Sequence, residues 1–355
     1  MGGNPSASRT RLRDVADLAG VSVKTVSNVV NGSAPVTAGT RAKVDAALTQ
    51  LNYRPNLAAR NLRRGRSGLV ALAVPEIDSP YFAELARRIA TAAERQGWTL
   101  LIDQTEGDGE RERLVTEGFR SQLIDGLIFS PIASGRAELA HRRDRTPMVL
   151  LGERVFDGPT DHVSIDNVAA ARTGVAHLLG LGRRRVAAIG RQRRPTAGTA
   201  RLRLQGYVDA LTAAGHDYDD ALVADTDSWR RADGAAAMTE LLRRRPPPDS
   251  VFCFNDLLAL GAMRALHDAD LRVPEDVAVV GFDDIEDGRF STPSLTTIRP
   301  DKDRIATLAV EVLAERLADA DVGRSGPARE LSAPFDLVVR ESTAGPVAGA
   351  VLSSG

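Results

Sequence analysis

Residues 12–31 read LRDVADLAGVSVKTVSNVVN, and this stretch decides how the amino-terminal segment folds. Apolar residues recur every three or four positions over 12–19 and again over 23–30, which predicts two short helices. Between them, Gly20 suits a left-handed turn and Ser22 suits the N-cap of the second helix. Helices this short are unstable alone, so we expect them to pack against each other across the turn.

The spacing of small and branched residues identifies the type of helix pair. Alanine, then glycine four residues later, then a β-branched residue six further on is the pattern of a DNA-binding helix-turn-helix, and here these are Ala16, Gly20 and Val26. A third helix is predicted from an N-cap at Thr37 to Asn52. The outward face of the second helix carries groups that can bond to base edges and phosphates, namely Lys24, Ser27, Asn28 and Asn31.

The charge of the chain is divided unevenly. Residues 1–66 contain eleven lysines and arginines against three aspartates, whereas the rest of the chain carries a net charge of −9. A basic segment on an acidic body indicates a polyanion as the partner of the first segment alone. A solvated basic tail and a purely structural three-helix bundle are the alternatives that these residues leave open.

Composition excludes several classes of protein. Cys253 is the only cysteine in 355 residues, so the chain can form no internal disulfide and no cysteine-based zinc site. The five histidines are scattered, and neither a metal nor a cofactor is predicted. No run of about 18 apolar residues occurs, and the amino terminus lacks the apolar region of a signal peptide. We therefore expect a soluble cytoplasmic protein with no membrane partner.

The pattern changes at Gly68, where strand and helix signals begin to alternate. Residues 69–74 form a continuous apolar run, as expected of a strand covered on both faces of a parallel sheet. Two successive sets of strands and helices predict an α/β body of two doubly wound lobes with right-handed crossovers. The strands are expected at 69–74, 99–102, 126–129 and 148–151, then at 185–189, 222–224, 251–254 and 277–280.

Many of these stretches closely resemble the lactose/galactose repressor (LacI/GalR) family of bacterial transcriptional regulators. The resemblance covers residues 12–31, 36–37, 40–41, 51–56 and 59–62 in the head, and 125–128, 165–167, 254–256, 280–284 and 293–298 among others in the body. It implies an all-α helix-turn-helix headpiece, a hinge helix and a two-lobed body similar to periplasmic sugar-binding proteins. It also implies three chain crossovers and a ligand cleft between the lobes.

The resemblance assigns residues to DNA binding. Val23, Lys24 and Asn28 are expected to contact bases. Leu62, on the hinge helix, is expected to enter the minor groove at the centre of the operator and kink it. The full expected set is Ser22, Val23, Lys24, Thr25, Ser27, Asn28, Asn31, Thr37, Tyr53, Asn56, Ala59 and Leu62.

The resemblance also assigns residues to a small-molecule effector, namely Phe82, Arg203, Trp229, Asn255 and Asp283. An arginine fork and carboxylates can span adjacent hydroxyl groups, and an indole can cover the apolar face of a sugar. One departure is Gly152, where the family has an acid, followed here by Glu153 and Arg154. Because the cleft is altered, the effector of a well-known member cannot be transferred. A sugar is favoured, with a purine or another non-sugar effector as the alternative.

The predicted organisation has four parts. A helix-turn-helix domain spans 1–54 with a flexible arm at 1–10, and a hinge spans 55–66. The effector domain spans 67–341, with an amino lobe at about 67–167 and 297–325 and a carboxyl lobe at about 168–296 and 326–341. A disordered tail spans 342–355, and it lacks the leucine heptads that make tetramers in the family, so a homodimer is expected.

These observations predict a ligand-responsive, sequence-specific repressor of sugar uptake or catabolism genes that binds a pseudo-palindromic operator as a homodimer. A sugar receptor without a DNA role is the rival binding module, and the basic head argues against it. No G-x-S-x-G, P-loop or Rossmann glycine pattern occurs, so an enzyme is not expected.

Overall fold

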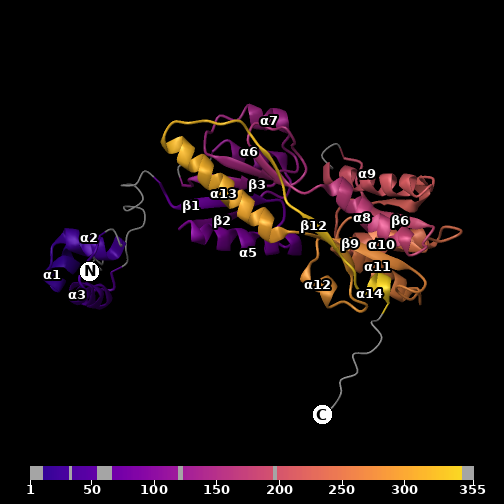
Figure 1. The fold of residues 1–355 in the computed structure, drawn as a ribbon, viewed down its shortest axis with the longest axis horizontal. Helices are drawn as coiled ribbons and strands as arrows, with labels where there is room; N and C mark the ends of the chain where they lie inside the picture. Colours follow the sequence, from indigo (N-terminus) through magenta and orange to yellow (C-terminus); the bar gives the residue numbers. More distant parts are fainter. Residues whose placement is uncertain (1–10, 32–33, 54–65, 119–122, 195–197, 346–355) are drawn as a thin grey trace, which may run out of the picture. The chain divides into compact units, whose positions relative to one another are not determined.

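The computed structural model describes residues 11–31, 34–53, 66–118, 123–194 and 198–345 (Figure 1). They form two compact units divided between Ser67 and Gly68, which we call the head and the body. The expected hinge, with Asn56, Ala59 and Leu62, lies outside the described residues, as does the expected flexible arm. In the parts that are described, no helix is long and apolar enough to cross a membrane.

The head contains the three predicted helices, α1 (Leu12–Ala19), α2 (Val23–Asn31) and α3 (Ala38–Gln50). Gly20 has a φ of 64°, which confirms the left-handed turn. The amide of Thr25 donates to the hydroxyl of Ser22 at 3.1 Å, which confirms the N-cap. The shared core of the three helices consists of Val15, Ala16, Val26, Val29, Val44 and Ala47.

The third helix begins where it was predicted but ends earlier. Thr37 caps it by accepting a hydrogen bond from the amide of Thr40 at 3.3 Å. The helix ends at Gln50 rather than Asn52, because Asn52 adopts a left-handed φ of 45°. Tyr53 follows directly and packs against the core of the head.

The amino lobe of the body is built on a parallel sheet that is buried on both faces. In β1, Val70, Leu72 and Val74 pack with one core cluster and Ala71 and Ala73 with another, as the apolar run predicts. Helices α5 (Pro80–Arg95) and α13 (Lys302–Asp321) lie side by side on one face, and α6 (Gly109–Thr116) and α7 (Arg136–Ala140) cover the other (Figure 1). The strands in spatial order are β11 (Glu330–Ser332), β5 (Asp161–Ser164), β4 (Met148–Leu151), β3 (Gly126–Phe129), β1 (Leu69–Val74) and β2 (Thr99–Gln104).

The carboxyl lobe repeats this plan. Its strands in spatial order are β12 (Phe335–Val338), β10 (Thr296–Pro300), β9 (Ala278–Phe282), β8 (Ser250–Cys253), β6 (Val186–Arg191) and β7 (Val223–Asp225). Only β12 is antiparallel to its neighbour among these described strands. The helical elements are α8 (Asn167–Gly180), α9 (Gly198–Ala213), η1 (Asp220–Leu222), α10 (Arg231–Leu242), α11 (Asp256–Asp268), α12 (Glu286–Arg289) and α14 (Glu341–Ala344). Apart from one added edge strand, each lobe has the doubly wound strand order 2-1-3-4-5, in which ligands bind beyond the carboxyl ends of the strands.

The chain passes between the lobes three times, which confirms the expected number of crossovers. The predicted lobe boundaries at 297 and 326 are wrong, however. The strand β10 pairs with β9 and therefore belongs to the carboxyl lobe, whereas β11 pairs with β5 in the amino lobe. The second and third crossovers therefore fall near Asp301 and Pro334.

The expected disordered tail at 342–355 also begins too early. Residues of α14 pack against the carboxyl lobe, and Ser342 is fully buried. Its hydroxyl donates to the carbonyl of Val279 at 2.7 Å and accepts from the amide of Thr296 at 2.8 Å. These bonds join the segment to β9 and β10, so the chain is structured through residue 345. Residues 346–355 lie outside the described residues.

Candidate functional site

A cavity of about 330 Å³ lies between the two lobes. Its wall includes residues that directly follow strands of both sheets, such as Pro75 after β1, Gly152 after β4 and Asp283 after β9. This is the position at which doubly wound sheets bind ligands. All five effector residues expected from the sequence line this cavity: Phe82, Arg203, Trp229, Asn255 and Asp283.

Arg203 is held in place by bonds to three other segments of the body. It lies on α9 and is only 6% exposed. Its Nε donates to Oδ1 of Asn167 at 2.8 Å, and its Nη1 donates to the carbonyl of Phe254. Its Nη2 lies 3.8 Å from Oδ1 of Asp283. Two of the three nitrogens therefore serve the fold, and Nη2 is the one that faces Asp283 at the cavity.

Two adjacent aspartates after β9 have different environments. Asp283 lines the cavity, and burial raises its pKa to about 6. Asp284 accepts hydrogen bonds from Arg340 at 2.6 Å and Arg289 at 2.8 Å. Burial raises the pKa of Asp284, but these two ion pairs outweigh that effect and hold the pKa below its ordinary value. Asp283 is therefore available to a ligand, whereas Asp284 fixes the carboxyl-terminal segment.

Trp229 is positioned by its own polar atoms and by Asn255. Its Nε1 donates to the carbonyl of Gly190 at 2.8 Å, and its carbonyl accepts from Nδ2 of Asn255 at 3.1 Å. The Oδ1 of Asn255 accepts from the amide of Leu258 at 2.8 Å and caps α11. Gly190 therefore orients the indole and Asn255 fixes the backbone of Trp229, and the amide of Asn255 keeps one N–H and one lone pair for a ligand.

Three other residues of the cavity wall, Tyr81, Glu153 and Thr199, were not among the effector residues expected from the sequence. The hydroxyl of Thr199 donates to Oε2 of Glu153 at 3.0 Å, which joins the carboxyl lobe to the amino lobe. Burial, and then the charges of Glu153 and Asp283, raise the pKa of Tyr81, so its hydroxyl stays protonated. In the sequence, two of them could have been found from their neighbours, because Tyr81 precedes the expected effector residue Phe82 and Glu153 follows Gly152.

Contacts between the lobes surround the cavity and hold them close together. Arg230 of the carboxyl lobe pairs with Glu76 and Asp78 of the amino lobe, each at 2.9 Å. The lobes approach most tightly at Gly198, where a Cβ atom would lie 2.6 Å from the carbonyl oxygen of Glu153. We call this arrangement, in which the lobes are in direct contact, closed, and only glycine fits at position 198 in it.

In the head, the first turn of α2 presents the expected base-contacting side chains. Val23 is 43% exposed, and Lys24 is also exposed. Ser27 and Asn28 follow on the same helix and are half-buried. The hydroxyl of Thr25 bonds with that of Ser22 at 2.8 Å, so these two residues also shape the helix start. The side chain of Asn31 is not described. Across the described residues, no group of histidines, cysteines and carboxylates could hold a metal ion.

Comparisons with known proteins agree with this architecture. Residues 11–56 match the family described as bacterial regulatory proteins, lacI family, and residues 175–343 match the periplasmic binding protein-like domain. The ribose operon repressor of Escherichia coli (strain K12) is 35% identical over 308 residues, which cover 86% of this chain and 92% of the repressor. The structure of the lac repressor dimer bound to operator and the anti-inducer ONPF has a TM-score of 0.79 and 30% identity, covering 95% of this chain and 99% of that one. The CelR–cellobiose complex has a TM-score of 0.68 and 32% identity, covering 94% and 100%.

Proposed function

This chain belongs to the lacI family of bacterial regulatory proteins, and on that premise we propose that it is a ligand-responsive transcriptional repressor. It binds a pseudo-palindromic operator as a homodimer through its head, and it binds a sugar effector in the cavity between the lobes. One observation carries this proposal: the five expected effector residues, which come from separate segments of the chain, line a single cavity, in a chain whose other unit is a helix-turn-helix.

The head has the shape and charge of a reader of duplex DNA. In a helix-turn-helix, the second helix enters the major groove and contacts base edges with its amino-terminal residues. Val23 offers apolar contact, for example to a thymine methyl, and Lys24 offers donors to guanine acceptors. The eleven basic residues in 1–66 favour phosphate contacts, which supply most of the non-specific affinity.

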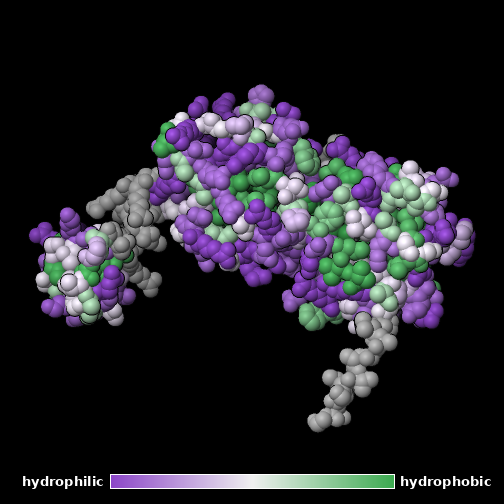
Figure 2. Space-filling view, in the orientation of Figure 1, coloured by the Kyte–Doolittle hydropathy of each residue, from purple (hydrophilic) through white to green (hydrophobic). Residues whose placement is uncertain are grey.

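A homodimer matches the two-fold symmetry of a pseudo-palindromic operator. The body presents apolar side chains to a second copy. Leu101 and Ile102 are 39% and 52% exposed on the edge strand β2, and Phe290 is 80% exposed at the end of α12. Figure 2 shows apolar residues gathered over the carboxyl lobe near β9 and α11, whereas the surface over α5 is hydrophilic. The lac repressor, to which this chain is similar, is described as a dimer bound to operator.

A sugar matches the chemistry of the cavity wall. The indole of Trp229 and the rings of Tyr81 and Phe82, which meet edge to face with centroids 5.2 Å apart, offer apolar faces to a sugar ring. Asp283 and Arg203 offer an acceptor and donors to neighbouring hydroxyl groups. Two of the similar proteins have a sugar in their descriptions, ribose in one and cellobiose in the other.

Effector binding acts on DNA affinity through closure of the lobes. A ligand that reaches Arg203 in the carboxyl lobe and Phe82 in the amino lobe favours the closed arrangement over an open one. In a dimer, closure moves the two amino lobes relative to each other. Operator affinity changes with that movement, by the free energy that couples effector binding to operator binding.

Selection from random duplex DNA by the full chain tests the DNA-binding function. We expect enrichment of one pseudo-palindromic sequence. Its association constant should fall with salt at a log–log slope of about −0.9 per phosphate contact. Lys24→Ala should weaken binding to the selected sequence by about 1–3 kcal/mol if Lys24 contacts a base. Failure to enrich any sequence would refute the proposed function.

A further inference from the structure

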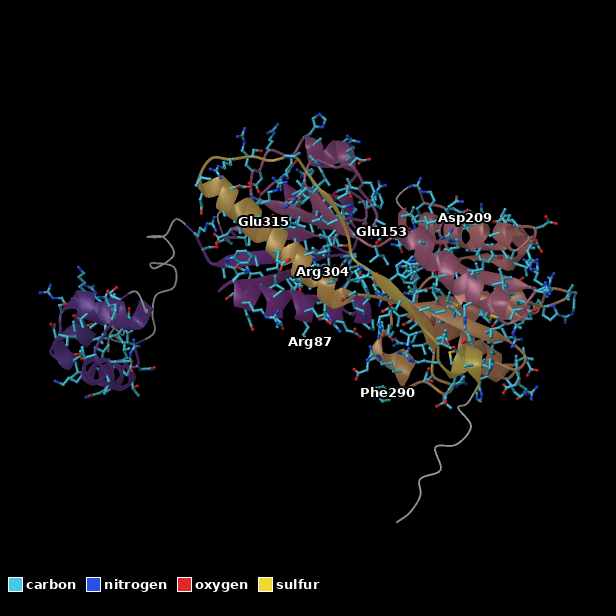
Figure 3. The ribbon with its side chains drawn as sticks, viewed as in Figure 1. Arg87, Glu153, Asp209, Phe290, Arg304 and Glu315 are labelled. Carbon is cyan, nitrogen blue, oxygen red and sulfur yellow. The ribbon has the colours of Figure 1, made fainter. Side chains whose placement is uncertain are left out.

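Glu153 places a negative charge on the cavity wall at the point where the two lobes face each other (Figure 3). Its hydrogen-bond partner within the described part of the chain is the hydroxyl of Thr199, which is a neutral donor. The neighbouring Arg154 donates instead to the carbonyl of Ala133 at 3.3 Å. No contacting cation among the described residues neutralises the Glu153 carboxylate.

The other charged groups of the cavity wall make contacts of their own, and Arg203 acts on Glu153 through its charge without a bond between them. Two acids have ion pairs with arginines that are not part of the wall: Glu76 with Arg230 at 2.9 Å, and Glu106 with Arg111 at 2.8 Å. Of the arginines in the wall, Arg203 already faces Asp283, and Arg194 donates to the backbone carbonyl of Asp227. With Glu76 and Glu106 paired in this way, the wall keeps three acids and three arginines, namely Glu153, Asp227, Asp283, Arg154, Arg194 and Arg203, but none of the three arginines bonds to Glu153.

We propose that Glu153 is a specificity-determining residue that restricts the effector to an uncharged compound with hydroxyl donors, and that it disfavours sugar acids and sugar phosphates. The inference rests on the effector site proposed above. An ionised carboxylate accepts hydrogen bonds and donates none, so a ligand hydroxyl satisfies it. A ligand carboxylate or phosphate would instead bring a like charge into a partly desolvated space, where repulsion is several times stronger than in water.

Glu153 lies where the lobes meet, so its preference for an uncharged ligand acts when the lobes close around that ligand. Its side chain bonds to Thr199 in the first turn of α9, the helix that also carries Arg203. A ligand that contacts Glu153 in the amino lobe can therefore reach Arg203 in the carboxyl lobe. An anionic ligand would meet the repulsion of Glu153 most strongly when the lobes are closed, so it would favour the open arrangement.

Calorimetric titration of the full chain with matched neutral and anionic compounds tests the proposal. The pairs are ribose and ribose 5-phosphate, glucose and glucuronate, cellobiose and cellobionate, and inosine and inosine 5′-phosphate. We expect the neutral member of one pair to bind at least about tenfold more tightly than its anionic partner. Glu153→Gln keeps the shape and an oxygen acceptor for Thr199, and it should reduce this ratio by at least about fivefold, because the like charge is removed.

Asp209→Asn is the matched control, since it removes the same charge from the surface of α9, where Asp209 accepts from Gln205 at 2.7 Å. It should leave the ratio unchanged. Equal binding of a neutral compound and its anion by wild type, or an unchanged ratio in Glu153→Gln, would overturn the proposal. If Glu153→Gln does not fold, the wild-type ratios decide alone. Preference for an anion that Arg203→Lys abolishes would refute the role of Glu153 but retain the effector site, whereas no binding in any pair would refute both.

Discussion

Gly198→Ala should weaken effector binding without unfolding the body. The new methyl carbon would lie 2.6 Å from the carbonyl oxygen of Glu153, where ordinary contact begins at 3.4 Å, so the lobes must separate there by about 0.8 Å. The obstacle is backbone, which cannot rotate away as a side chain does. Overpacking of this kind costs about 1–3 kcal/mol, and here the cost falls on the closed arrangement alone. Closure and the apparent affinity for the effector should therefore fall about 5- to 150-fold.

The assay is calorimetric titration of the effector into wild type and Gly198→Ala, with thermal unfolding of both chains without ligand. Gly180→Ala is the matched control, because Gly180 ends the neighbouring helix α8 and a Cβ there would meet nothing within 4 Å. We expect the control to bind the effector like wild type, and both variants to retain the unfolding temperature of the free chain. Wild-type affinity in Gly198→Ala would refute the idea that the ligand is bound by closed lobes.

Three further outcomes are expected. Burial raises the pKa of Asp283 to about 6, so the native carboxyl contributes stability below about pH 4 that is lost as the pH rises through 6. Asparagine does not titrate, so the free energy of unfolding of Asp283→Asn minus that of wild type should rise by on the order of 2–3 kcal/mol from pH 4 to pH 7 in urea unfolding. A difference that does not change with pH would contradict this expectation. Glu112 is fully buried, and its carboxylate accepts hydrogen bonds from the amides of Ile132, Ala133 and Ser134 at 2.6–3.1 Å. In the same assay, Glu112→Ala should lower the free energy of unfolding by about 3–5 kcal/mol, and Glu112→Gln should lower it by less. A loss below about 1 kcal/mol in Glu112→Ala would show that these amides find other acceptors. Leu62→Ala should weaken operator binding at least about tenfold in anisotropy titrations while sparing random duplex DNA, and unchanged operator affinity would exclude a minor-groove wedge.

The sequence predicts the head well because its determinants are local. Gly20, Ser22 and Thr37 each act within three or four residues along the chain, through a left-handed turn or a cap. The strands of the body are also visible as apolar runs, since a strand buried on both faces needs apolar side chains in both directions.

Assignments that depend on pairing between distant segments were predicted less well. The strand β10 belongs to the carboxyl lobe because it pairs with β9, and nothing in residues 296–300 alone indicates that partner. The segment around Ser342 shows no apolar periodicity, because it is held by polar bonds to β9 and β10 rather than by an apolar face. Local pattern therefore gives the elements but not all of their neighbours.

The candidate site divides in the same way. Arg203 and Asp283 were identified through the resemblance, and the structure brings them to one cavity. Glu153 and Thr199 were not identified, because their hydrogen bond joins residues 46 positions apart in different lobes. Such a contact follows from how the lobes face each other, which no local spacing records.

We propose that a ligand in the cavity controls the affinity of the head for DNA. An anisotropy titration of the full chain on its selected operator, with and without the effector, in wild type and in Arg203→Lys, tests this claim. We expect the effector to change the operator dissociation constant of wild type by about 5- to 150-fold. Arg203→Lys should bind the operator like wild type without effector and should lose the response. An operator affinity that the effector leaves unchanged in wild type, or a full response in Arg203→Lys, would contradict the claim.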